Sequence, residues 1–227
     1  YFFVFGAFVA LALWLPQYLI KVYGVDIRAA GMIAAFFSVP ASLFRAYGGH
    51  LSDVYGARRV MYWTFLVSVA ATFVLSYPPT DYVVQGVNGP IAFHAEMGLI
   101  GFTVTVFILG FFMALGKAAV FKHIPVYYPQ SVGSVGGLVG MIGGLGGFIL
   151  PIVFGMLLDL TGLWTSCFML LFLVALGSLT WMHFAIRQME KETEGEKLAE
   201  LPAFPEMQGM GKAGRKPIQE SAAVLTD

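Results

Sequence analysis

Apolar residues dominate the chain in six long runs that are separated by shorter polar segments. Each run is long enough to cross the roughly 30 Å hydrocarbon core of a membrane as a helix. No run alternates apolar and polar residues with a period of two, so helices are predicted rather than strands. The predicted spans are residues 1–20, 29–48, 60–77, 98–121, 132–157 and 163–186. Their short connections predict antiparallel neighbours in an all-α bundle.

The composition supports a polytopic membrane protein. Hydrophobic residues make up 58% of the chain and charged residues 11%, whereas a soluble domain carries about 25% charged residues. The formal net charge is zero, so nothing suggests a nucleic-acid partner. The single cysteine, Cys167, permits no disulfide within the chain. No cofactor and no metal site are expected.

Basic residues gather on the connections that follow the second and fourth spans and on the tail. They include Arg58, Arg59, Lys122 and Arg187. By the positive-inside rule these segments face the cytoplasm, so we expect a multi-pass protein of the cell inner (plasma) membrane with a cytoplasmic C-terminus. The chain opens inside an apolar run, at Tyr1, without a basic n-region, which we interpret as a truncation and not a signal peptide.

Two domains are predicted. Residues 1–187 form a six-helix transmembrane half, and residues 188–227 form a cytoplasmic tail that starts as a short helix and is otherwise largely disordered. The longest connection between spans, residues 77–97, is rich in Gly and Pro and is expected to be full of turns.

The first part of the fifth span, up to residue 147, carries eight glycines at spacings of one to three residues, which places a glycine stripe on one helix face. Each would cost roughly 0.8–1 kcal/mol in a soluble helix, but membrane helices tolerate such residues where they pack closely. The stripe predicts either a closely packed neighbouring helix or a small ligand against the backbone. The glycines are Gly133, Gly136, Gly137, Gly140, Gly143, Gly144, Gly146 and Gly147.

Arg45 lies inside the second span, eight residues before Asp53 and therefore about 12 Å deeper in the membrane. An arginine at such depth costs at least ~2.5 kcal/mol, so it should face a polar cavity or a partner. The second span offers no acid to pair with it, and a planar guanidinium suits a planar oxyanion. The alternative is that Arg45 snorkels to the cytoplasmic headgroups.

The loop after the second span contains Gly49, Asp53, Gly56 and Arg58 in the spacing G-x-x-x-D-x-x-G-x-R. This spacing resembles the loop motif of the major facilitator superfamily, in which the Asp helps to hold the inward-closed state. The match departs at Val54, where the family often has a basic residue. An ordinary polar turn with snorkelling arginines is the alternative.

Aromatic and basic residues of two other spans are further candidates. Tyr1, Phe5 and Phe8 share a helix face, where Tyr1 could donate a hydrogen bond to an anion and Phe5 could stack on one. They could equally be core or lipid-facing aromatics. Lys117 lies near the end of the fourth span, and it either snorkels outward, adds positive charge to a cavity or titrates.

Longer stretches resemble the nitrate/nitrite porter family (NarK-type) within that superfamily, over about residues 1–187. The glycine-rich helix looks like the nitrate-signature helix, with the sequence VGGLVGMIGGLGGFILPIVFG, and the preceding segment GKAAVFKHIPVYYP is also similar. Arg45, in SLFRAYGGHLSD, falls where the family has its substrate-binding arginine. Tyr1 and Phe5, in YFFVFGAF, fall where a Tyr and a Phe line the site.

The resemblance implies a fold of twelve helices in two halves, of which this chain supplies the C-terminal six. The partner would be the N-terminal six-helix half, and nitrate or nitrite would bind between the halves, which rock to expose it alternately. The implied substrate-binding residues are Arg45, Tyr1, Phe5, Gly143, Gly144, Gly146 and Gly147, and the implied gating loop contains Gly49, Asp53, Gly56 and Arg58.

The mode of coupling stays open between two mechanisms. The segment GKAAVFKHIP resembles the branch that runs nitrate/proton symport, in which Lys117 would be the coupling candidate that carries a proton. The family has a second binding arginine, from the second helix of its first half. Two arginines facing one anion, Arg45 and that residue, would instead favour nitrate/nitrite antiport. We favour symport.

Two other functions are also considered. One is a major facilitator carrier for another solute, and the other is a membrane sensor or assembly subunit that transports nothing. An enzyme is not expected, because the spans contain no carboxylate pair, metal cluster or nucleophile–base pair.

Overall fold

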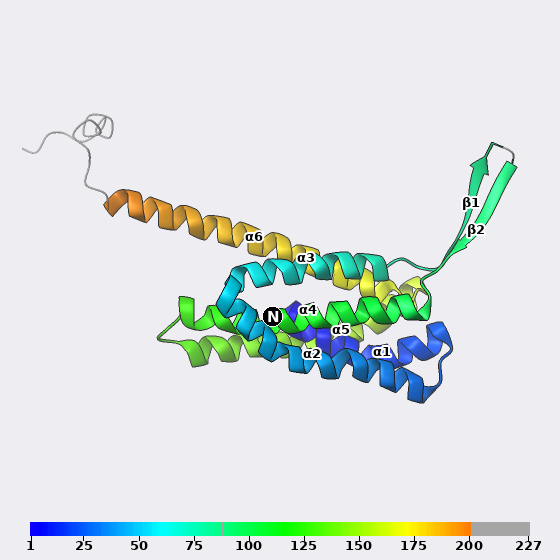
Figure 1. Cartoon of the computed structure of the whole chain (residues 1–227), viewed down its shortest axis with the longest axis horizontal. Coiled ribbons are helices and arrows are strands. Elements are labelled where there is room, and N and C mark those ends of the chain that lie inside the picture. The colour runs from blue at the N-terminus through cyan, green and yellow to red at the C-terminus, as the bar shows by residue number, and fades with distance from the viewer. Residues whose placement is uncertain (88, 201–227) are drawn as a thin grey trace, which may run out of the picture. The chain divides into compact units, whose positions relative to one another are not determined.

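The computed structural model describes residues 1–87 and 89–200, with side chains up to residue 192, as a helical membrane protein (Figure 1). Six helices in this part are long and apolar enough to cross a membrane, which confirms the predicted all-α, multi-pass class. The helices are η1 (Phe2–Ala7, a π-helix) continued by α1 (Phe8–Tyr23), α2 (Ile27–Tyr55), α3 (Ala57–Leu75), α4 (Leu99–Tyr127), α5 (Val132–Thr161) and α6 (Ser166–Glu200).

Local sequence signals explain several of the helix ends. Gly24 and Gly162 end α1 and α5 in the left-handed conformation, with φ of 63° and 69°, which glycine adopts without a steric penalty. The Asp26 carboxylate accepts hydrogen bonds from the backbone N–H groups of Arg28 and Ala29 and so caps α2. Gly56, with φ of 84°, allows α2 to turn directly into α3.

The helices of residues 1–182 pack around α4, which contacts both α2 and α3 (Figure 1). The core is apolar and contains the fully buried Leu15, Leu109 and Phe168. The Tyr18 ring stacks on Phe102 with ring centroids 5.0 Å apart. At the start of the first span, η1 packs against α5. This contact positions the candidate site.

The connection between α3 and α4 forms a β-hairpin, which the sequence patterns did not predict. Strand β1 (Thr80–Gly86) pairs antiparallel with β2 (Gly89–Ala95). Across the strands, the His94 ring lies 2.6 Å from a carboxylate oxygen of Asp81, and this hydrogen bond, followed by one with Glu96, raises the pKa of His94. The alternating pattern is missing because both faces of this hairpin are largely exposed.

The last helix continues beyond its predicted end. α6 runs through residue 187 to Glu200 without a break, so the expected short helix of the tail is its continuation. The chain divides into two compact units, Tyr1–Met182 and His183–Asp227. The rest of the predicted tail, residues 201–227, lies outside the described residues, and the predicted domain division stays a prediction.

Candidate functional site

The first helix places two predicted site residues together. The rings of Tyr1 and Phe5 stack with centroids 5.1 Å apart and an interplanar angle of 7°. Both lie on η1, where the backbone C=O of Tyr1 accepts hydrogen bonds from the N–H groups of Phe5 and Gly6. Both rings are half-buried, so they keep one side open to a ligand. Short π-helical segments of this kind are frequent at functional sites.

The backbone of Gly143 lies against this aromatic stack. A Cβ atom at Gly143 would lie 2.5 Å from a ring carbon of Tyr1 and 3.0 Å from one of Phe5. The first distance is shorter than real Cβ contacts and the second is tighter than most of them, so any residue other than glycine would displace the rings from this position. Gly143 therefore supports the stack from the side of α5.

Arg45 joins the same region from α2. Its guanidinium carbon lies 5.6 Å from the centroid of Phe121, a ring on α4. Phe121 in turn meets Tyr1 edge to face, with centroids 5.1 Å apart and an angle of 81°. A chain of contacts thus links Arg45 through Phe121 to the stack of Tyr1 and Phe5, and three helices contribute to it.

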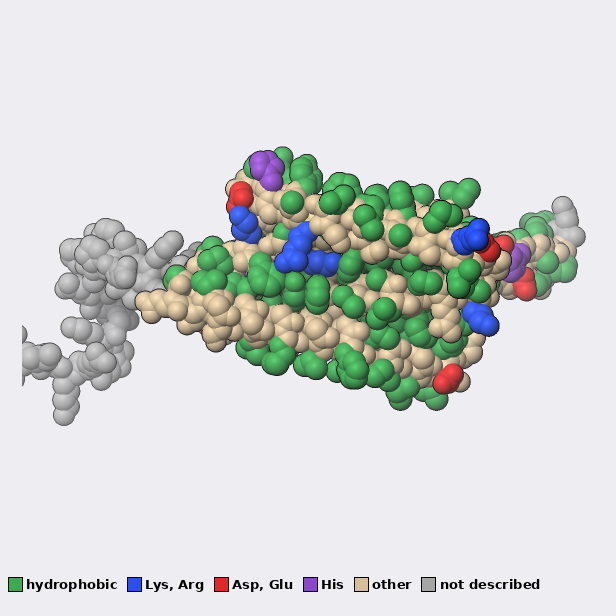
Figure 2. All heavy atoms as spheres, turned by 90° about the horizontal axis from the view of Figure 1, so that it is seen from below, with side chains coloured by type: hydrophobic (Ala, Val, Ile, Leu, Met, Phe, Trp, Pro, Cys, Tyr) green, Lys and Arg blue, Asp and Glu red, His purple; other side chains and the backbone are tan. Residues whose placement is uncertain are grey.

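Arg45 also lines an open cavity of about 530 Å³ between α2 and α4, together with Ser42, Ala46, Gly49, Ala118, Phe121 and Lys122. Lys122 forms an ion pair with Asp53, whereas Arg45 makes no ion pair or side-chain hydrogen bond with any described residue. Figure 2 shows basic side chains in the middle of a largely hydrophobic face, away from its ends. A guanidinium with free donors in such a cavity is suited to binding an anion.

Lys117, on α4, lies against two aromatic residues of the first span. Its side chain is buried, with 5% of the residue exposed. The ammonium nitrogen lies 2.9 Å from the centroid of the Phe8 ring and 5.8 Å from that of Phe5. Phe8 itself is buried against Phe37, so it is a core residue although it shares the predicted face with Tyr1 and Phe5. Lys117 therefore contacts Phe5 and Phe8, whereas Arg45 contacts Phe121.

The glycines of α5 divide into two sets. Gly143, Gly146 and Gly147 are buried against the first helix, and a Cβ at Gly146 would lie 2.9 Å from the backbone oxygen of Phe2. Gly144, by contrast, is exposed and has no atom within 4 Å of an added Cβ. Gly133, Gly137 and Gly140 share this open environment. The structure thus brings three of the four predicted glycines to η1 and α1 and leaves Gly144 apart.

The predicted gating loop is largely helical, and the end of α2 and the start of α3, joined at Gly56, are tied to α4 at one end of the bundle. The Lys122 ammonium donates to both carboxylate oxygens of Asp53, at 2.6 and 2.9 Å. The Arg58 guanidinium donates to the Tyr127 hydroxyl at 3.4 Å. Gly49 lines the Arg45 cavity one turn before Asp53. The sequence alone did not identify Lys122 as the partner of Asp53.

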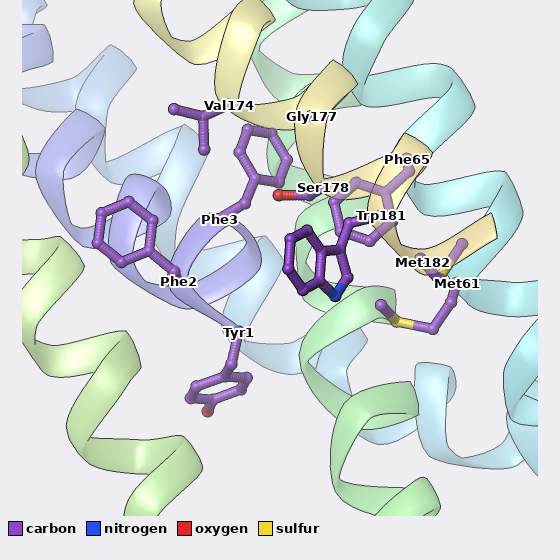
Figure 3. A pocket seen from close by; sticks show the side chains of 10 residues that line it. All are labelled: Tyr1, Phe2, Phe3, Met61, Phe65, Val174, Gly177, Ser178, Trp181 and Met182. Atoms are coloured by element: carbon purple, nitrogen blue, oxygen red, sulfur yellow. The ribbon is translucent and has the colours of Figure 1, made fainter. Parts of the chain in front are cut away.

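A second cavity, of about 470 Å³, lies beside the amino end of η1 (Figure 3). It is lined by Tyr1, Phe2, Phe3, Met61, Phe65, Val174, Gly177, Ser178, Trp181 and Met182. In Figure 3 the ring of Tyr1 points away from the cluster around Phe3, Phe65 and Trp181. This cavity offers no cationic side chain to an anion, so the Arg45 cavity is the better candidate site.

Among the described residues, no group of three His, Cys, Asp or Glu side chains is placed so that it could hold a metal ion. Phe121 is the contact residue that sequence reasoning missed. Its signal was the spacing of four residues from Lys117, which puts both side chains on one face of α4.

Comparison with known proteins gives a consistent set of relatives. The chain is 48% identical over 189 residues to a protein of Thermus thermophilus named "Probable nitrate/nitrite antiporter NarK1", covering 82% of this chain and 42% of that protein. It is 32% identical over 198 residues to the "Nitrite extrusion protein" of Bacillus subtilis, covering 86% and 45%. It is 32% identical over 171 residues to the "Probable nitrate transporter NarT" of Staphylococcus haemolyticus, covering 75% and 40%. The chain spans less than half the length of these relatives.

The family assignment rests on a match that covers nearly the whole chain. The Major Facilitator Superfamily profile matches residues 1–225, and the six membrane-spanning helices fit one half of its twelve-helix fold. The nitrate and nitrite transporters above agree with this match. The chain belongs to the Major Facilitator Superfamily.

Proposed function

We propose that this chain forms the C-terminal half of a secondary transporter that moves nitrate, nitrite or both across the membrane by alternating access. The names of its relatives support the substrate class. The observation that carries the proposal is Arg45, a guanidinium without an acidic partner among the described residues, beside aromatic rings in an open cavity. A planar fork of N–H donors matches a planar oxyanion.

In this mechanism each predicted residue has a distinct role. Arg45 binds the anion through parallel hydrogen bonds, and Phe5 offers it a ring face while the Tyr1 hydroxyl donates to it. Gly143 supports the two rings from behind, whereas Gly146 and Gly147 let α5 and the first helix lie in close contact. These last two glycines then act on the anion only through packing.

The remaining half of the site comes from the N-terminal six helices of the same protein. The open faces of α2 and α5 support this partner, because large apolar residues such as Leu43 on α2 and Leu138 on α5 are exposed. Gly144 lies on the open side of α5 and is assigned to contact with that half or with the anion between the halves. The lipid bilayer covers the outer faces, and the C-terminus lies in the cytoplasm, according to the distribution of basic residues.

Coupling to protons is proposed to use Lys117, since its ammonium group is buried beside Phe5 and Phe8. Symport of nitrate with a proton is the preferred mode. Nitrate/nitrite antiport is the second candidate, favoured by the name of the Thermus thermophilus relative.

The test is nitrate uptake by proteoliposomes that contain the complete transporter, with and without an imposed proton gradient. Arg45→Lys keeps the charge but removes the fork, so we expect kcat/KM for nitrate to fall about ten- to hundredfold, the value of a charge-assisted hydrogen bond. Arg59→Lys is the matched control, because Arg59 is exposed at the start of α3 and lies outside the cavity.

The outcomes separate the mechanisms. Unchanged uptake in the folded Arg45→Lys protein would contradict the anion site. Uptake that follows the proton gradient in vesicles without internal anion supports symport, whereas uptake that requires internal nitrite identifies exchange. Uptake of an organic solute in place of nitrate would assign the protein to another group of carriers.

A further inference from the structure

Phe121 has contacts that no other described aromatic residue combines. One face of its ring lies toward the guanidinium of Arg45, at 5.6 Å, and it meets the ring of Tyr1 at 5.1 Å. A Cβ on Gly136 of α5 would lie 3.8 Å from the Phe121 ring, an ordinary van der Waals distance. The ring is therefore held between α2, η1 and α5, while it still lines the cavity.

The chemistry of this contact differs from that of an ion pair. A carboxylate that oriented Arg45 would use the donors of the guanidinium edge and neutralise its charge. An aromatic ring attracts the cation through its quadrupole and accepts no N–H from that edge. Because no described acid contacts Arg45, an aromatic contact can orient the side chain and leave all five donors free.

We propose that Phe121 is a positioning residue, which orients the Arg45 guanidinium toward the bound anion without consuming its hydrogen-bond donors. Through its edge contact with Tyr1, the same ring sets the spacing between the guanidinium and the stack of Tyr1 and Phe5. The inference rests on the proposed function in assuming that the anion bound by Arg45 is nitrate or nitrite. The contact between Phe121 and Arg45 can be tested apart from that assumption.

The kinetic test compares two variants of Phe121 in the complete transporter. Phe121→Leu removes the quadrupole but keeps an apolar side chain, so we expect KM for nitrate to rise roughly two- to thirtyfold, the range of a cation–π contact. Phe121→Tyr keeps the ring face and should restore KM to within about twofold of wild type. We expect kcat to change less than KM in both.

Phe107→Leu is the matched control. Phe107 lies on the same helix, is half-buried like Phe121 and stacks on Phe36 of α2 with centroids 4.9 Å apart, but no cation among the described residues lies over its ring. Loss of general packing between α2 and α4 would affect both Leu variants equally. A KM increase in Phe107→Leu as large as in Phe121→Leu, or no increase in either, would overturn the proposal.

A second measurement needs no transport. Phenylglyoxal reacts with arginine side chains, and mass spectrometry can follow the modification of Arg45 in the purified protein without any anion. Phe121→Leu should make this reaction at least about twofold faster because the guanidinium loses its fixed orientation, and Phe107→Leu should not. Equal rates would refute the positioning role. If wild type takes up no nitrate but the Arg45 rates differ as expected, the proposed function fails and the contact stands.

Discussion

At the scale of single residues, the two basic side chains inside the membrane have different surroundings. Arg45 is exposed at the wall of an open cavity, whereas Lys117 is buried beneath the Phe8 ring. An exposed guanidinium keeps its charge and its donors for a ligand. A buried ammonium is more expensive to keep charged, which makes it the better group for releasing and taking up a proton. The same contrast underlies the proposed division between anion binding by Arg45 and proton coupling by Lys117.

Lys117→Met should therefore abolish proton-driven nitrate accumulation and leave nitrate exchange within about threefold of wild type. The methionine fills the space of the lysine stem but carries no proton. The measurement is nitrate accumulation in proteoliposomes under a pH gradient, compared with exchange against internal nitrate. Lys21→Met, at the exposed end of α1, is the control. Gradient-driven accumulation that survives in Lys117→Met would remove Lys117 from the coupling mechanism.

At the scale of the elements, α5 acts as a helix with two different glycine faces. Gly146 contacts the backbone of the first helix, where an added Cβ would lie 2.9 Å from the oxygen of Phe2 and 3.1 Å from the Cα of Gly6. Two backbones at this distance leave no room for any side chain. Gly144 is only two residues away, but a Cβ atom added to it would have no packing neighbour within 4 Å. A glycine is thus required at position 146 by the packing of α5 against the first helix within these six helices.

We expect Gly146→Ala to lower the free energy of unfolding by about 1–3 kcal/mol, the usual cost of overpacking a well-packed contact. Gly144→Ala is its matched partner and should change the free energy of unfolding of this six-helix half by less than about 0.5 kcal/mol. The measurement is denaturant unfolding in detergent, followed by circular dichroism. Equal destabilisation by both alanines would contradict the two-face description of α5.

At the scale of the whole molecule, the ion pair between Asp53 and Lys122 links the end of α2 to α4. Both side chains are largely exposed, at 60% and 44%, and exposed pairs contribute only about 0–1 kcal/mol to stability. The pair is therefore a weak source of folding energy. Its position next to the Arg45 cavity suits a contact that changes during the proposed alternating-access cycle.

Asp53→Asn should slow net nitrate transport by roughly three- to tenfold while the thermal midpoint shifts by no more than about 2 °C. Exchanging the charges, with Asp53→Lys and Lys122→Asp together, should restore much of the rate because the attraction is restored. Asp159→Asn, an exposed acid at the end of α5, serves as the control. A double variant no faster than Asp53→Asn would exclude the pair from gating.

The sequence by itself determined the fold class and the six membrane spans, and it singled out the residues proposed for the site. Long apolar runs fix membrane helices because length and hydrophobicity are local properties of the chain. Single-residue signals are local as well. The turn between α2 and α3 agrees with the glycine at position 56 of the loop motif, and Arg45 was recognisable as a charge placed deep in a span. The β-hairpin was not predicted, because its strands expose both faces and so lack the period-two pattern of apolar residues.

Only the tertiary structure decided which of these residues meet. The pairing of Asp53 with Lys122, 69 residues later, depends on how α2 lies against α4, which no local pattern encodes. The same packing puts Phe121 between Arg45 and Tyr1, and it assigns Gly143 and Gly146 to one face and Gly144 to another. A glycine stripe states that something comes close to a helix, but the identity of that neighbour is a property of the folded bundle.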